Sequence, residues 1–200
     1  VANAEGVVTG QGRIVWSPDG EVTSTGQFSS ESIDFAAAFG PVRGASGTIE
    51  FTDLLGLTTA PGQTLRVASV NPGIEVADGE VGFELRNGEV LAVTGGSWPF
   101  MGGELILRAV DLNLGVSEER RYIFEIVGLD AGTFVTEMDL ENISATGLFD
   151  GAVPIVFDAN GNGRIDTGVL ISRPPGGTVS YVGELTYEDL SPIANFAFDA

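Results

Sequence analysis

Apolar residues follow a spacing of two along most of this chain, in short runs that glycine, asparagine, aspartate or proline interrupt. A spacing of two places successive side chains on opposite faces of a β-strand, and the interrupting residues favour turns. The pattern predicts strands at residues 7–16, 22–30, 47–51, 64–70, 73–77, 81–85, 90–94, 104–114 and 121–127. The sequence therefore predicts an all-β, or strongly β-dominated, protein.

One order of strands and turns occurs twice. In both copies an apolar strand, at 81–85 and again at 153–157, is followed by a glycine turn, a second strand, a proline and a glycine pair. Such a unit cannot bury its apolar face alone, so its repetition is typical of a scaffold that extends a surface. We interpret residues 1–200 as a single β-repeat module, with repeat units at about residues 42–115 and 143–200.

The alternation breaks at residues 129–138. Asp130 can cap a short helix there, and Phe134 and Met138 would lie four residues apart on one side of it. We expect this helix to cover an open end of the sheet.

Four features suggest that the chain is a piece of a larger protein. It has no signal peptide, no initiator Met and no run of 18 apolar residues. Residues 191–200 also begin like a helix and stop before a cap. We expect any membrane anchor to lie outside these residues.

The bulky cluster Trp98-Pro99-Phe100 lies between two glycine pairs, at 95–96 and 102–103. One interpretation is a strand corner that is anchored in the core. The other is an apolar contact at the lip of a groove.

The formal net charge is −19, from 28 acidic and 9 basic residues. Such a chain repels phosphates and lacks the counterion release on which nucleic-acid binding depends, so DNA, RNA and anionic bilayer surfaces are poor partners. Outward-facing carboxylates also serve solubility.

Catalytic chemistry has few candidates here. The sequence contains no cysteine and no histidine, which excludes thiol and imidazole nucleophiles, bases and zinc ligands. The carboxylate pairs Asp139 with Glu141 and Glu188 with Asp189 could act in acid–base chemistry only in a pocket that perturbs them. We expect no enzyme.

The segment from Asp158 to Asp166 resembles the first nine positions of a calcium loop, with oxygen-bearing side chains at Asp158, Asn160, Asn162 and Asp166 and glycine at position six. Position 12 is Val169, where a bidentate glutamate is expected. A hairpin is one interpretation and a weak calcium site the other; no other cofactor is expected.

Strand 121–127 has two different faces. Tyr122, Phe124 and Ile126 share one face, and the other face holds Arg121, Ile123, Glu125 and Val127. If the sheet is concave, we expect the aromatic face to be the inner one.

Residues 95–105 (GGSWPFMGGEL), together with the segment from Tyr122 to Leu185, resemble the C-terminal part of the YdbH branch of the AsmA-like (TamB-related) envelope proteins, a family also labelled "dicarboxylate transport". The resemblance is close over residues 81–200. The first 80 residues share only the general character of the family's sequences. It implies an elongated, curved, U-shaped sheet with a hydrophobic groove. It also implies a periplasmic location in a Gram-negative envelope, with an inner-membrane anchor on the parent protein.

The resemblance further implies that phospholipids are carried between the inner and outer membranes, with their acyl chains as the direct partner and envelope proteins at either membrane as further partners. Alternation then places Tyr122, Phe124, Ile126, Val153, Ile155 and Phe157 on the groove lining. If the sheet instead closes on itself, the same residues are ordinary core. A structural envelope domain and a dicarboxylate-transport accessory are the alternative functions.

Overall fold

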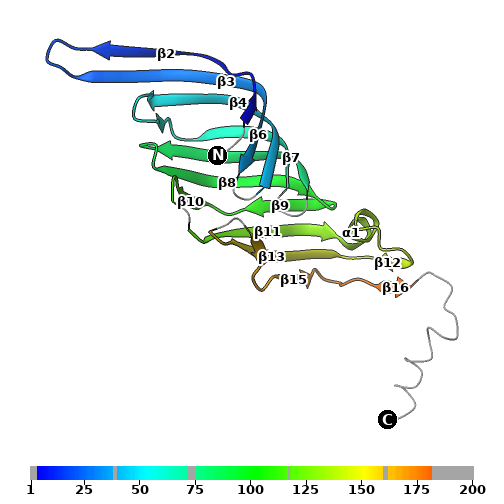
Figure 1. Ribbon diagram of the computed structural model, residues 1–200. Helices are drawn as coiled ribbons and strands as arrows, with labels where there is room; N and C mark the ends of the chain where they lie inside the picture. The colour runs from blue at the N-terminus through cyan, green and yellow to red at the C-terminus, as the bar shows by residue number, and fades with distance from the viewer. Residues whose placement is uncertain (1–3, 38–39, 72–74, 117, 160–161, 182–200) are drawn as a thin grey trace, which may run out of the picture.

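The computed structural model describes residues 4–37, 40–71, 75–116, 118–159 and 162–181. In this part of the chain almost all regular structure is β, in one antiparallel sheet of 14 strands and one small two-stranded sheet (Figure 1). The prediction of an all-β, curved sheet with a short helix is confirmed.

The strands of the large sheet are β1 (Ala4–Gly6), β2 (Thr9–Trp16), β3 (Val22–Ala37), β4 (Gly40–Asp53), β5 (Thr58–Thr59), β6 (Gln63–Val70), β7 (Val76–Arg86), β8 (Val90–Phe100), β9 (Gly103–Leu107), β10 (Val110–Asn113), β11 (Arg120–Asp130), β13 (Leu148–Phe157), β14 (Gly163–Ile165) and β15 (Val169–Ser172). Helix α1 spans Ala131–Glu137, and β12 (Ile143–Ala145) pairs with β16 (Val179–Tyr181) in the small sheet.

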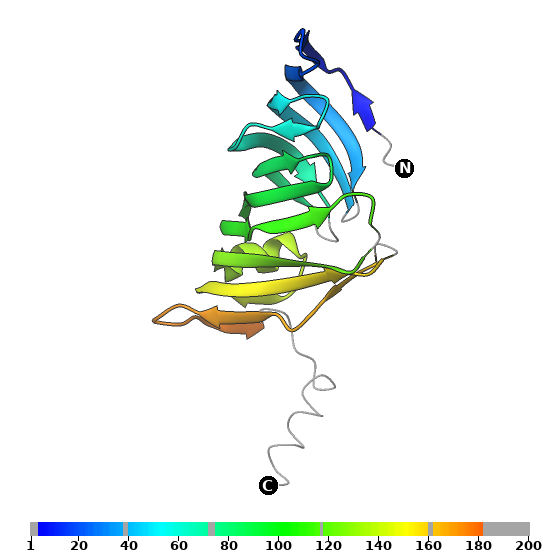
Figure 2. The same ribbon diagram turned by 90° about the vertical axis from the view of Figure 1, so that its left-hand side faces the viewer.

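The large sheet is open. Its strand order is β1-β3-β4-β6-β7-β8-β9-β11-β13-β14, and no pairing among the described residues joins the two ends of this series. Figure 2 shows the strands stacked side by side along the sheet, with a bend along their length. The alternative in which the sheet closes on itself is therefore wrong for the part of the chain that the structure describes.

The two-residue alternation sets the faces of the sheet. In the β11–β13 pair, Tyr122 lies opposite Ile155 and Phe124 opposite Val153. Directly opposed residues of an antiparallel pair point to the same side, so these apolar side chains share one face. A cluster of buried hydrophobic residues forms along this face and continues from β4 to β13.

Several predicted strand ends are wrong, chiefly where the prediction treats glycines as breaks. Strand 90–94 was expected to stop before the glycine pair at 95–96, but β8 continues through it to Phe100. The reason is steric: the Trp98 indole lies so close to the neighbouring strand that a Cβ at Gly79 would overlap it, and a Cβ at Gly96 would lie 2.7 Å from its Cη2. These glycines make room for a buried tryptophan within a continuous strand.

Other strand ends differ too. β3 and β4 are longer than predicted, residues from 81–85 form part of the longer β7, and 104–114 divides into β9 and β10. The expected helix at 191–200 lies outside the described residues, as does part of the second repeat unit.

Helix α1 is confirmed with its cap. The Asp130 carboxylate accepts hydrogen bonds from the Thr133 backbone N at 2.7 Å and the Thr133 hydroxyl at 2.9 Å, which lowers the pKa of Asp130. Figure 1 shows α1 at the end of β11, and its Phe134 packs against the hydrophobic cluster.

A two-pronged ion pair stabilises the C-terminal side of the sheet. Arg173 donates from Nε and Nη2 to the two Asp150 carboxylate oxygens at 2.7 and 2.6 Å, and Asp150 also accepts from the Gly128 backbone N at 2.8 Å. The Arg173 hydrogen bonds, followed by the Gly128 bond, hold the pKa of Asp150 below its ordinary value of 3.8.

This depressed pKa predicts an acid-dependent loss of stability. The unfolded carboxylate binds its proton more tightly than the folded one, so the contribution of Asp150 is present above pH 3.8 and is lost as pH falls through the folded pKa. We expect Asp150→Asn to flatten the decline of the melting temperature between about pH 5 and pH 2 relative to the wild type. Identical declines in the two proteins would contradict this role.

Candidate functional site

A hollow of about 310 Å³ lies on the apolar face of the sheet. This volume is at the lower end of the range of about 300–1,000 Å³ that is usual for small-ligand sites. All of its lining residues are hydrophobic: Phe35, Val42, Ala45, Ile49, Leu65, Val67, Val70, Val76, Val81, Phe83, Leu91, Val93, Trp98, Leu107, Leu112, Tyr122, Phe124 and Phe157.

The lining residues come from many strands. They belong to β3, β4, β6, β7, β8, β9, β10, β11 and β13, so the hollow runs across the strands and along the sheet. We call this surface the apolar groove. A site of this shape suits a long, flexible, apolar molecule better than a compact polar one.

Three of the six residues predicted for the lining do line the apolar groove, namely Tyr122, Phe124 and Phe157. The rings of Tyr122 and Phe157 meet edge to face, with their centroids 5.6 Å apart. The other three share the face but lie outside the lining: Ile126 is buried in the hydrophobic cluster, and Val153 and Ile155 pack against it, half-buried.

Sequence reasoning did not assign most of the lining. Val81 and Phe83 on β7, and Leu91 and Val93 on β8, alternate as clearly as the residues of β11 and contribute to the same groove. Their alternation was a usable signal. Trp98 lacked such a signal, because the adjacent glycines suggested a corner and not a strand.

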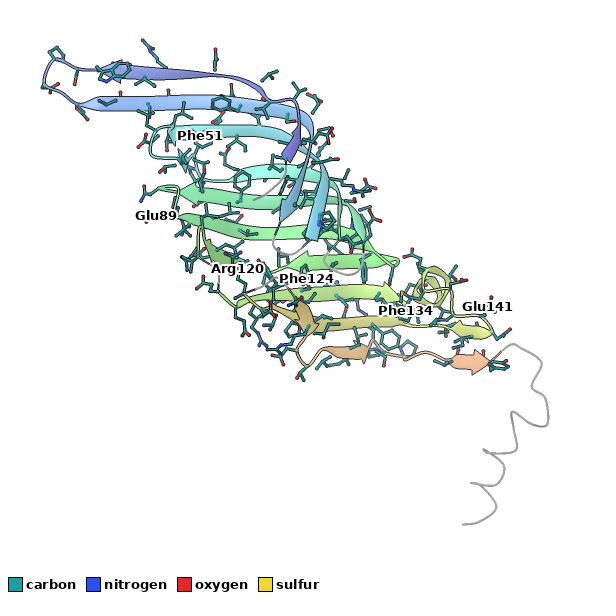
Figure 3. All side chains as sticks on the ribbon, in the orientation of Figure 1. Phe51, Glu89, Arg120, Phe124, Phe134 and Glu141 are labelled. Atoms are coloured by element: carbon teal, nitrogen blue, oxygen red, sulfur yellow. The ribbon has the colours of Figure 1, made fainter. Side chains whose placement is uncertain are left out.

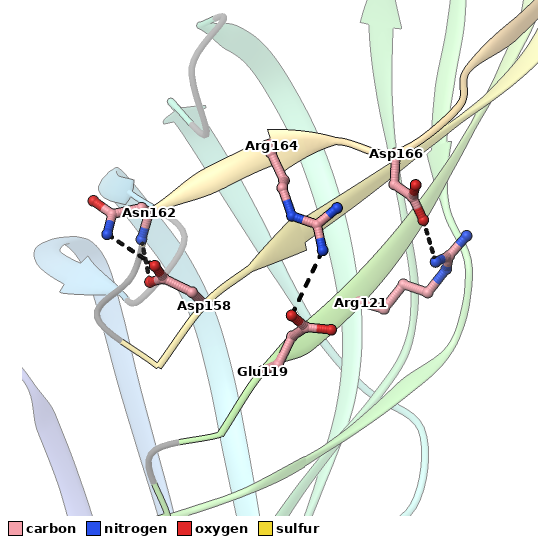
Figure 4. A network of polar contacts seen from close by, with 6 residues as sticks. All are labelled: Glu119, Arg121, Asp158, Asn162, Arg164 and Asp166. Carbon is pink, nitrogen blue, oxygen red and sulfur yellow. Dashed lines mark hydrogen bonds and ion pairs between the residues drawn. The ribbon is translucent and has the colours of Figure 1, made fainter.

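The opposite face of β11 carries charged side chains. Glu125 forms an ion pair with Arg108, and Arg121 forms one with Asp166 at 2.6 Å (Figure 4). Charged side chains therefore occupy the outer positions Arg121 and Glu125, and the apolar Ile123 and Val127 share that face with them.

Arg120 is a cation on the inner face of the sheet, beside the groove lining. Arg120 lies directly opposite Phe157 in the β11–β13 register and two residues before Tyr122. Burial raises the pKa of the Tyr122 hydroxyl, and the positive charge of the neighbouring Arg120 partly opposes that rise. Apart from Arg120, the ion pairs and the alternation place the charged residues of β11 on the outer face.

The predicted calcium loop is described only in part. The Asp158 carboxylate accepts from the Asn162 backbone N at 2.9 Å and its side-chain Nδ2 at 3.0 Å, while Asp166 is paired with Arg121 (Figure 4). No group of three potential metal ligands occurs among the described residues. Asn160 lies outside them, and weak calcium binding stays a prediction.

Of the two carboxylate pairs considered for acid–base chemistry, Asp139 and Glu141 are exposed to solvent near α1. Figure 3 shows Glu141 at that end of the sheet, away from Phe124 in the groove. Glu188 and Asp189 lie outside the described residues. In the described part of the chain, no helix has the length and hydropathy needed to cross a bilayer.

Comparison with known proteins gives one match. A family model described as "YdbH-like: Intermembrane phospholipid transport protein YdbH" matches residues 1–200, so it includes the first 80 residues. No curated protein and no solved structure matches the chain. Since the family model covers the full sequence given, the chain belongs to the YdbH-like family of intermembrane phospholipid transport proteins.

Proposed function

We propose that the apolar groove holds the acyl chains of phospholipids as they move between the inner and outer membranes. The chain would then be one segment of a periplasmic bridge whose parent protein is anchored in the inner membrane. Membership of an intermembrane phospholipid transport family supports an envelope location and a lipid cargo. The observation that carries the proposal is the uninterrupted hydrophobic lining across the strands of an open sheet.

The physical basis is hydrophobic burial. Each methylene group that leaves water for the groove contributes about 0.8 kcal/mol, so an acyl chain is held by many small and similar contributions. The polar atoms of Trp98 and Tyr122 are buried, so the lining exposes only apolar surface and offers no single position that fixes the chain. The chain can therefore shift along the groove at little cost. The headgroup stays in water at the open side.

Neither alternative function has a specific observation in its favour. A dicarboxylate-transport role requires basic side chains that converge on the ligand, and the groove lining contains none. A purely structural domain would fill its apolar face with its own side chains, whereas here about 310 Å³ stays open on that face. The family is one of lipid transport, and we propose no catalytic step.

The test is to identify what the protein binds in cells. The protein is purified without detergent from a bacterial envelope, and its lipids are extracted, identified by mass spectrometry and quantified by phosphate content. We expect phospholipid in stoichiometric or greater amounts. A protein that is folded by circular dichroism and free of phospholipid would contradict the proposal.

A further inference from the structure

Arg120 is an unusual residue for its position. Its register opposite Phe157 places it on the inner face of the sheet, at the first position of β11. Figure 3 shows Arg120 at the end of the strand beside the connection from β10, with Phe124 farther along in the groove. A guanidinium group therefore lies at the rim of a groove whose lining is hydrophobic.

No carboxylate among the described residues forms an ion pair with Arg120. Its Nη2 donates to the backbone carbonyls of Asn113 at 3.1 Å and Val116 at 2.9 Å, and its side chain also lies within hydrogen-bonding reach of the Tyr122 hydroxyl. The next residue, Arg121, pairs with Asp166 on the outer face. Arg120 is thus held by neutral acceptors, and no ion pair in the described part of the chain compensates its charge.

The nearby acids are engaged elsewhere. Glu118 accepts a hydrogen bond from the Asn113 side chain at 3.0 Å, and Glu119 pairs with Arg164 at 3.6 Å. A half-buried cation without a counter-ion is costly, and a chain with a net charge of −19 has many acids that could have occupied a neighbouring position. An anionic group from outside the protein would supply the missing partner.

We infer that Arg120 binds the phosphate of a phospholipid whose acyl chains lie in the apolar groove. The inference rests on the proposed function and adds the contact for the headgroup. The planar guanidinium presents several donors in a fixed fork that matches phosphate oxygens, and its position at the rim is where a headgroup would meet water. The hydrophobic lining beside it, at Leu112, Tyr122 and Phe157, would take the first part of the acyl chain.

The test compares two lipids with the same acyl chains, phosphatidylethanolamine and diacylglycerol, in competition with a fluorescent fatty acid for the purified protein. Phosphatidylethanolamine carries no net charge, so the overall acidity of the protein affects both lipids alike. The variant is Arg120→Gln, whose side-chain amide can still donate to the Asn113 and Val116 carbonyls. Arg121→Gln is the matched control on the outer face.

We expect the wild type and Arg121→Gln to prefer phosphatidylethanolamine about fivefold, the effect of one partly exposed charge-assisted contact. Arg120→Gln should lose that preference and keep its affinity for diacylglycerol. An unchanged preference in Arg120→Gln would overturn the inference. Arg120 would then have only a structural role, as the donor to the Asn113 and Val116 carbonyls, and the proposed function would be unaffected.

Inorganic phosphate provides a further arm of the test. If it binds the wild type and not Arg120→Gln, with no effect of the substitution on lipid preference, the site belongs to free phosphate and the lipid assignment is overturned. If neither lipid binds the wild type or either variant, the proposed function fails and the inference fails with it.

Discussion

The substitution Phe124→Glu is expected to remove at least about nine-tenths of the phospholipid that copurifies with the protein. Phe124 lines the apolar groove, where it lies opposite Leu107 and Val153 on the neighbouring strands. A carboxylate there would be desolvated by any acyl chain that passes it, and an unpaired buried charge costs several kcal/mol. Each 1.4 kcal/mol lowers affinity tenfold, so the loss of lipid should be large.

Val127→Glu is the matched control for this prediction. Val127 is on the same strand, is 36% exposed and alternates with buried Ile126, so a carboxylate there points away from the groove. We expect its bound lipid to equal that of the wild type, and circular dichroism should show that both variants are folded. Equal lipid content in the folded Phe124→Glu variant would mean that acyl chains do not pass Phe124.

The second large effect concerns the stability of the sheet. Gly79→Ala is expected to lower the free energy of unfolding by about 1–3 kcal/mol, the usual cost of overpacking a filled core. A methyl group at Gly79 would overlap the indole of Trp98, which is only 4% exposed and has no room to move aside. Denaturant unfolding, followed by intrinsic fluorescence, measures the change.

Two further variants isolate the steric cause. Gly168→Ala adds the same methyl group where the nearest atom is 3.6 Å away, so its stability should match that of the wild type within about 0.5 kcal/mol. In a Trp98→Ala background the overlap is removed, so Gly79→Ala should cost less than half of what it costs alone. The same cost in both backgrounds would mean that Trp98 is not the reason for the glycine.

Local sequence patterns predicted the class of fold well, because alternation is a property of each strand by itself. Residues 121–127 were correctly assigned two faces, and Asp130 was correctly assigned as the cap of α1. These features depend on residues that are only a few positions apart, so they can be predicted from the local sequence.

The details of the groove depend on contacts between distant strands, and local patterns could not show them. Val153 and Ile155 alternate like the lining residue Phe157, yet they pack against the cluster outside the hollow, so alternation alone does not decide which side chains border it. Irregular pairing between β3 and β4 likewise puts Val42 and Ala45, three residues apart, on the same face. Such bulges shift the register without a clear mark in the sequence.

The central claim, that phospholipid acyl chains occupy the apolar groove, is tested most directly by photo-crosslinking in living cells. A photoreactive residue is placed at Phe124 in the groove and, in a matched protein, at Glu125, which pairs with Arg108 on the outer face. Phospholipid captured at position 124 and not at position 125 is the predicted result. Crosslinks within the protein alone at position 124, with no lipid, would contradict the account and indicate a face that is filled by the protein itself.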